Sequence, residues 1–513
     1  MIIAIVAIIN EKNRKHLLLK LSPTDYILFS LLFLLLSYFV FYKSFYSRGI
    51  YLRQLYFSNS ILPNNPNNWA FPIAILGLSY FFYKVWYSFF PYQRIEKVTA
   101  FYEKQIEDGE LPFLLDLIER YHTMDIIKFI KKGKDVNLDN RGFAETYDKP
   151  TLREKFDTFF NSIIRKLLPI SWVNRRAYAS MVLNDILNNP GFIIYTAKNR
   201  PYFYAKIIIH FKDSKIEHFP SELVNSFLSD LIIEKSFWLK KELIQSENFD
   251  FGQPSYFFKE NKILGALLED LSVAKINQVW QPFGTIAIDE IEGERQEGYN
   301  SKLFREFREE QFLWEFKVYF GIKFFKIIII EALVRKYKES HFFFIYYTNI
   351  TDSILETFEK YPPSNIEEIR TNYHQLIEIM TDNIFLWLDV SERRKDDFLF
   401  YNIILCLGQL IHRICNSKYY GEKHKIYLID RTLCLYCNLN PQNPNADIFR
   451  TQLEKILIKP SMLTEDDDHY YTVIKNTWEN EFDKVPHYSV SGNDHEYFIR
   501  LKENVIRPLN LDM

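Results

Sequence analysis

The sequence predicts a membrane protein in which an N-terminal two-helix transmembrane hairpin carries a large, mostly α-helical soluble domain. Three observations predict this fold class. Two long apolar segments lie within the first 98 residues, apolar side chains recur at helical spacing in the rest, and only 15 of 513 residues are glycine. So few glycines disfavour turn-rich β-architectures and glycine-dependent phosphate loops.

The first membrane span is predicted at residues 26–42, which carry no charge, and the second at residues 69–90, where Lys84 is the charged residue. At 1.5 Å per residue these segments measure about 26 and 33 Å, so both can cross a hydrocarbon core of roughly 30 Å. Lys84 lies within two turns of the end of the second span, from where its ammonium can reach the headgroups. Two buried core helices are the alternative interpretation, although such helices normally carry a polar stripe.

Aromatic and basic residues flank both spans. Tyr42 and Trp69 stand where the spans meet their connecting loop, and such amphipathic rings favour the membrane interface. Four basic residues precede the first span, four lie at or after the end of the second, and three lie in the connecting loop. This majority predicts that both termini and the soluble domain are cytoplasmic, at the inner (plasma) membrane. The abundance of Phe, Tyr, Ile, Lys and Asn, which share AT-rich codons, favours a bacterial source.

The hairpin module and the remaining chain differ in charge. Residues 1–98 carry a net charge of +7, whereas residues 99–513 carry −9. A net-acidic domain without a basic stripe is poorly suited to holding a phosphate backbone. The expected partners are therefore the lipid bilayer and either another protein or a second copy of the chain, and nucleic acid is disfavoured.

The soluble part is expected to form two helical subdomains. The first covers residues 99–288 and the second residues 301–513, with the acidic segment 289–300 (DEIEGERQEGYN) as the connection. A third apolar segment, residues 318–334, contains two lysines and a glutamate that would be costly in lipid unless paired. We therefore predict a buried helix there rather than a third span.

Residues 108–142 (DGELPFLLDLIERYHTMDIIKFIKKGKDVNLDNRG) resemble a single ankyrin repeat. Gly109 and Gly142 are 33 residues apart, where that repeat places its turns, and residues 133–137 (GKDVN) match its helix-ending turn. The segment departs from the family because Leu-Pro-Phe at 111–113 replaces the usual Thr-Pro-Leu-His and no second copy follows. The resemblance implies protein recognition. The alternative is a plain helix–turn–helix that ends in a glycine cap.

All four cysteines lie between residues 406 and 437. His412 and Cys415 are three residues apart, as are Cys434 and Cys437, and eighteen residues separate the two pairs. This is the spacing of a structural zinc site in which one cysteine is replaced by histidine, and two antiparallel helices could close the tetrahedron. The alternative is four thiols that pack as small hydrophobic groups in an apolar helical hairpin.

The rest of the sequence indicates little chemistry. An acidic and histidine-containing region lies at residues 465–469 (EDDDH), with His487 and residues 494–496 (DHE) further on, but nothing in the sequence fixes its geometry. Nucleotide-binding, serine-hydrolase and metalloprotease motifs are absent, and the catalytic residues of any activity are unknown. Three functions remain: a non-enzymatic sensor, adaptor or scaffold anchored in the membrane, a membrane-perturbing or pore-forming effector of a bacterial stress or phage-defence system, and a metal-dependent enzyme.

Overall fold

The computed structural model is mostly helical over the residues that it describes. These residues are 11–49, 66–86, 95–132, 182–210, 219–246, 261–337, 343–362, 370–394, 397–439, 443–458 and 500. Within these ranges, β-pairing is limited to an isolated antiparallel bridge between Glu306 and Thr371. The mostly α-helical class predicted from the sequence is therefore confirmed.

The chain divides into two compact units. The first comprises Met1–Phe192 with Asp213–Ile216, and the second comprises Ile193–Lys212 with Glu217–Met513. Within the second unit, the acidic segment predicted as a connection is helical, because α18 (Trp280–Gln296) continues through it into a 3-10 turn. Glutamate, glutamine and arginine are good helix formers, so their charge alone did not identify a loop.

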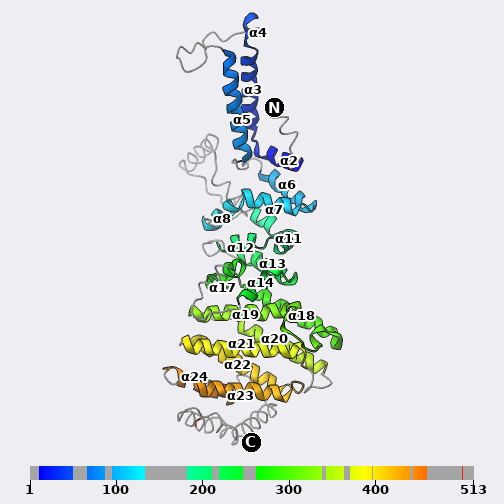
Figure 1. Ribbon diagram of the computed structural model, residues 1–513, viewed down its shortest axis with the longest axis vertical. Coiled ribbons are helices and arrows are strands. Elements are labelled where there is room, and N and C mark those ends of the chain that lie inside the picture. The colour runs from blue at the N-terminus through cyan, green and yellow to red at the C-terminus, as the bar shows by residue number, and fades with distance from the viewer. Residues whose placement is uncertain are drawn as a thin grey trace, which may run out of the picture. The chain divides into compact units, whose positions relative to one another are not determined.

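The first unit contains the hairpin and a group of shorter helices (Figure 1). Its elements are α2 (Glu11–Lys20), α3 (Pro23–Val40), α4 (Tyr42–Ser47), η1 (Pro66–Trp69), α5 (Ala70–Trp86), α6 (Ile95–Glu107), α7 (Leu111–Tyr121), α8 (Thr123–Lys132) and the π-helical turn η4 (Val182–Leu187). Helices α3 and α5 lie side by side along their lengths.

The start of α3 is fixed by local sequence. Ser22 is the N-cap, Pro23 occupies the first helical turn, and Asp25 completes a capping box with Ser22. A serine cap followed by proline and an acidic third residue satisfies the backbone N–H groups at the start of a helix. The chain bends by 94° at this point, between the Arg14–Lys20 and Thr24–Val40 segments.

Helices α7 and α8 coincide with the first part of the segment that resembles an ankyrin repeat. They are separated by His122, and Gly109 precedes them with a φ of +73°, a conformation that favours glycine. Residues 133–142, which carry the rest of the resemblance, lie outside the described residues. The ankyrin-like repeat stays a prediction.

The second unit is built from stacked helices. In Figure 1 the helices from α18 to α24 lie in successive rows, and α19 packs against α18 and α21, which packs in turn against α22. The elements are α11 (Pro190–Asn199), which begins in the first unit, α12 (Tyr202–Ile208), α13 (Phe219–Ile233), α14 (Phe237–Gln245), α16 (Lys262–Leu268), α17 (Leu271–Ile276), α18, η6 (Gly298–Asn300), η7 (Lys302–Phe304), η8 (Glu310–Glu315), α19 (Lys317–Val334), α20 (Phe343–Lys360), α21 (Asn372–Arg394), α22 (Asp397–Asn416), α23 (Glu422–Asn438) and α24 (Ala446–Ile458).

Helix α19 forms the centre of this core and confirms the predicted buried helix at 318–334. Almost its whole length is buried. Its two buried charges are paired, with Lys323 Nζ 2.9 Å from a Glu310 carboxylate oxygen and Glu331 bound by Arg335. Pairing is what makes a buried charge tolerable.

One described helix is long and apolar enough by itself to cross a membrane, and it is Phe398–Asn416 within α22. It is 61% buried, and it packs against α20, α21 and α24, so it belongs to the core of the second unit. The two spans predicted from the sequence do not meet the same length and hydropathy requirements as single helices. Thr24–Val40 passes only together with Arg14–Lys20 across the bend, and Ala70–Lys84 is shorter than a full span.

Candidate functional site

The hairpin of α3 and α5 is antiparallel and has a packed inner face. The ring of Phe29 on α3 lies 5.7 Å from Tyr80 and 6.3 Å from Phe81 on α5, measured between ring centroids. Gly77 on α5 faces Leu32 on α3, and a Cβ placed at Gly77 would lie 3.9 Å from the Leu32 side chain, in ordinary van der Waals contact. These contacts fix which face of each helix points inward.

The outer face of the hairpin is apolar and exposed. About half of the exposed large apolar side chains among the described residues belong to α3, α4, α5 and Phe41 between α3 and α4, with Phe71 72% and Phe33 68% exposed. Its members are Tyr26, Ile27, Leu28, Leu31, Phe33, Leu34, Leu35, Val40, Phe41, Tyr46, Phe71, Ile75, Leu76, Phe82 and Tyr83. A contiguous apolar surface of this kind marks contact with a membrane or with another protein.

One end of the hairpin holds a polar cluster centred on Asp25. The carboxylate accepts a hydrogen bond from the Tyr80 hydroxyl at 2.5 Å and lies 3.1 Å from the Lys84 ammonium. It also accepts bonds from the backbone N–H and the hydroxyl of Ser22, each at 2.7 Å. The sequence predicts that Lys84 reaches the headgroups, which stays a prediction, and the structure adds Asp25 as its partner within the hairpin. Spacing along the sequence could not indicate a pair 59 residues apart.

The opposite end of the hairpin is aromatic. Tyr42 begins α4 and packs its ring 5.8 Å from Tyr38 and 6.0 Å from Tyr46. Trp69 ends η1 immediately before α5, and because the hairpin is antiparallel it lies at the same end as Tyr42. The two interfacial aromatic residues singled out from the sequence therefore share the end that is remote from Lys84.

A second polar cluster lies where α2 meets α7. The Lys20 ammonium sits 3.8 Å above the centroid of the Tyr121 ring, the Arg120 guanidinium lies 5.5 Å from it, and the His16 ring lies 5.0 Å away. Burial, followed by the positive charges of Lys20 and Arg120, lowers the pKa of the His16 imidazole to about 3. Burial, followed by Arg120, lowers the pKa of Lys20 to about 8. The surroundings of both groups therefore disfavour further positive charge.

The residues of the predicted zinc site lie on α22 and α23. His412 Nε2 is 3.0 Å from the Asn416 side-chain amide, Cys415 is buried, and Cys434 is exposed. Among the described residues, no three potential ligands gather closely enough to hold a metal ion, and the side chain of Cys437 lies outside the description. Structural zinc stays a prediction. It requires one zinc equivalent in elemental analysis of the purified chain.

The fourth cysteine behaves as the packing interpretation expects. Cys406 is buried on α22, and its thiol lies 3.9 Å from the Phe344 carbonyl oxygen on α20. Burial raises the pKa of this thiol to about 12. A thiol with so high a pKa is inert and acts as a small apolar group.

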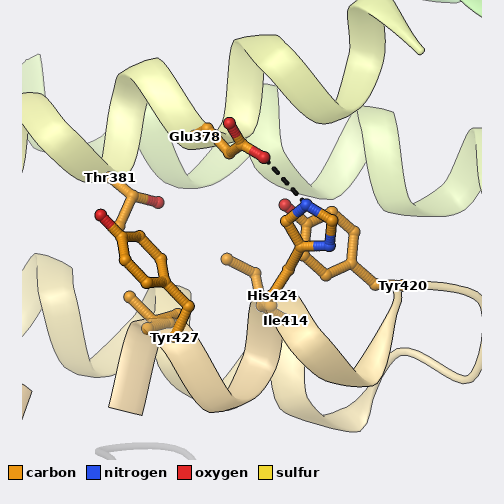
Figure 2. A pocket seen from close by; sticks show the side chains of 7 residues that line it. Glu378, Thr381, Ile414, Tyr420, His424 and Tyr427 are labelled. Atoms are coloured by element: carbon orange, nitrogen blue, oxygen red, sulfur yellow. Dashed lines mark ion pairs between the residues drawn. The ribbon is translucent and has the colours of Figure 1, made fainter. Parts of the chain in front are cut away.

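A small surface pocket lies between α21 and α23 and was not foreseen from the sequence. Figure 2 shows Glu378 on α21 facing His424 on α23, with His424 Nε2 2.9 Å from the carboxylate. Arg370 binds the same carboxylate. The rest of the lining is formed by Thr381, Ile414, Tyr420, Tyr427 and Leu428. The cavity volume is about 20 Å³. That holds one water molecule, whereas pockets for organic ligands measure roughly 300–1,000 Å³.

A buried histidine lies behind this pocket. The His374 ring stacks on Tyr420 with centroids 5.4 Å apart and lies 6.0 Å from the His424 ring. Burial, followed by the charges of His424 and Arg370, lowers the pKa of His374 to about 4. The group is therefore a neutral core histidine that accompanies an ion pair. The acidic and histidine-containing region after residue 464 lies outside the described residues.

Comparison with known proteins identifies no relative, since no family model, no curated protein and no solved structure matches the chain. The function therefore has to be argued from the hairpin and from the clusters described above.

Proposed function

We propose that this chain is a membrane-anchored, non-enzymatic sensor, adaptor or scaffold, in which the α3–α5 hairpin crosses the inner membrane and a cytoplasmic helical domain binds other proteins. The observation that carries the proposal is the apolar outer face of the hairpin. The inner face of the same helices is packed, whereas these outer apolar side chains stay exposed, so packing within the described part of this protein does not explain why they are apolar.

Hairpin dimensions support a bilayer as the partner of this face. Helix α3 has 18 residues and α5 has 17, which correspond to about 27 and 26 Å of helix. A hydrocarbon core of roughly 30 Å needs little more, and modest thinning or tilting covers the difference. Covering a large apolar side chain is worth about 1.5–3 kcal/mol when it is fully exposed beforehand, so fifteen partly exposed ones stabilise insertion strongly.

The charges of the hairpin are compatible with this placement. Asp25 and Lys84 are the charged residues of α3 and α5, and they neutralise each other at one end. An ion pair at the membrane edge costs far less than a charge at the bilayer centre. The aromatic end with Tyr42 and Trp69 then faces the other interface, as expected for amphipathic rings.

Protein binding is proposed for the helical domain because of its rows of stacked helices. The pocket at Glu378 and His424 holds a water molecule at most. A stack of helices presents an extended outer surface, and helical-repeat proteins bind their partners on such a surface. The membrane anchor then raises the local concentration of the domain at the membrane surface.

Membrane fractionation and a hairpin exchange test the proposal together. We expect the full chain to remain in the membrane after alkaline carbonate washing, and a chain lacking residues 22–90 to be released. Replacing residues 22–90 by an unrelated two-helix hairpin should restore both membrane attachment and partner capture by proximity labelling. Release of the wild-type chain by carbonate would contradict the anchor, and loss of partner capture in the exchanged chain would contradict a passive role of the hairpin.

A pore-forming or membrane-perturbing effector is the second candidate, and the same apolar face favours it. Apolar helices in a bilayer can exchange lipid contacts for contacts with other copies, so this face could also assemble hairpins. A dye-release assay on liposomes containing the purified chain separates the two candidates. Dye release by the wild-type chain, lost after the hairpin exchange, would establish the effector.

A further inference from the structure

Helix α2 runs at nearly a right angle to α3. The Arg14–Lys20 segment runs at 94° to the Thr24–Val40 segment of α3. If α3 crosses the bilayer, as proposed above, α2 then runs nearly parallel to the plane of the bilayer. Lys20 stands two residues before the Ser22 N-cap and so lies at the level of the hairpin end that holds Asp25 and Lys84.

Positive charge gathers at this level from two helices. Lys20 on α2 and Arg120 on α7 both lie over the Tyr121 ring, at 3.8 and 5.5 Å from its centroid. His16 from α2 packs on the same ring at 5.0 Å. Lys20 is buried against the ring, whereas Arg120 is exposed. Water therefore screens the charge of Lys20 only weakly, and the exposed guanidinium of Arg120 can reach a ligand.

The electrostatics of this cluster favour an anion. Arg120 lowers the pKa of Lys20, and the two cations together lower the pKa of His16, after burial in each case. An anion placed beside Arg120 would offset the repulsion among these groups. A guanidinium donates paired hydrogen bonds to phosphate oxygens, and an aromatic ring beneath it limits its movement.

We propose that Arg120, in the positive field of Lys20 and over the Tyr121 ring, binds the phosphate of an anionic phospholipid headgroup. The proposal rests on the membrane placement of the hairpin. It adds that the anchor recognises the charge of the lipid and not its tails alone. Each basic residue near a membrane surface contributes about 1 kcal/mol to binding of anionic lipid, which corresponds to roughly a five-fold change in affinity.

Native mass spectrometry of the full chain in a neutral detergent tests this inference. The probes are short-chain phosphatidylglycerol, short-chain phosphatidylcholine and inorganic phosphate. We expect phosphatidylglycerol to bind in preference to phosphatidylcholine, and Arg120→Gln and Lys20→Gln each to weaken it about five-fold. Arg120→Lys should retain most of the affinity. Lys128→Gln, which removes an exposed charge from α8, is the matched control and should bind as the wild-type chain does.

Several results would overturn the inference. These are equal binding of the two lipids, wild-type affinity in Arg120→Gln, an equal loss in Lys128→Gln, or phosphate binding that equals lipid binding and identifies a site for soluble anions. Circular dichroism of Lys20→Gln, whose side chain is buried, shows whether a loss of binding is a loss of fold. Carbonate washing of the same variants keeps the two proposals apart, because the anchor can hold while headgroup selectivity fails.

Discussion

Replacing Lys84 by methionine tests the polar end of the hairpin directly. The ammonium lies 3.1 Å from Asp25, and the two side chains are 19% and 3% exposed, so water screens the pair weakly. Their attraction is about 5 kcal/mol at an effective dielectric constant of 20, but desolvation offsets most of it. Polar contacts between membrane helices retain roughly 0.6–1.7 kcal/mol in measured cycles. We therefore expect a coupling of about 1–1.5 kcal/mol.

The assay is a double-mutant cycle of Lys84→Met, Asp25→Asn and the combination, read by hydrogen-exchange mass spectrometry of the membrane-embedded chain. The reporters are the backbone N–H groups of Asp25 and Tyr26, which bond to Ser22. Losing 1.4 kcal/mol of local stability should speed their exchange about ten-fold. Lys43→Met, an exposed lysine of α4 at the other end, is the control. Strictly additive effects of the two single variants would show that Asp25 and Lys84 are not energetically coupled. An equal effect of Lys43→Met would show that the stabilisation is not specific to the hairpin end that holds Asp25 and Lys84.

Three further predictions concern the second unit, and urea unfolding followed by circular dichroism measures each. Burial lowers the pKa of His374 to about 4, so the free energy of unfolding should decrease as the pH falls from 6.5 to 4 and the buried ring has to be protonated. His374→Gln should remove about 3 kcal/mol of this decrease, and an unchanged loss of stability in acid would contradict the prediction. Glu242→Ala should cost about 1–2 kcal/mol because its carboxylate accepts from the first backbone N–H groups of α16, and a neutral result would exclude that cap. Gly321→Ala should cost about 1–3 kcal/mol because its Cβ would meet a backbone oxygen of α18 at 2.9 Å, whereas Gly293→Ala, with open space around it, should be tolerated.

Helix positions were predictable because they follow from local chemistry. The capping box at Ser22 and Asp25, with Pro23 after the cap, starts α3 within three residues of the predicted span. The buried helix at 318–334 was predictable because unpaired charges are costly in lipid and tolerable when paired in a core. The identity of the partners was not predictable. Glu310, which binds Lys323, precedes the segment in a 3-10 turn and carries no signal of its own.

The candidate sites were less predictable, because each depends on packing between distant helices. The zinc spacing indicated that His412 and Cys415 share one helix, and both do lie on α22. The spacing could not show that His412 bonds Asn416 on the same helix. The clusters at Asp25 and at Tyr121 join residues that are 59 and 101 positions apart, so periodicity along the chain says nothing about them.

The distribution of charge within the hairpin favours an anchor over a pore. A channel through assembled hairpins needs polar or small side chains on the face that lines it. The exposed residues of α3 and α5 are mostly large and apolar, with Thr24, Ser30 and Ser79 as the polar ones, and Asp25 and Lys84 pair with each other at one end. A ring of these hairpins would therefore present Phe and Leu side chains to water, unless Asp25 and Lys84 separated and the helices rotated. A pore requires the ion pair of Asp25 and Lys84 to separate, whereas an anchor requires it to stay formed. The Lys84→Met cycle measures how strongly the pair is coupled, and the hairpin exchange shows whether the function needs this particular hairpin.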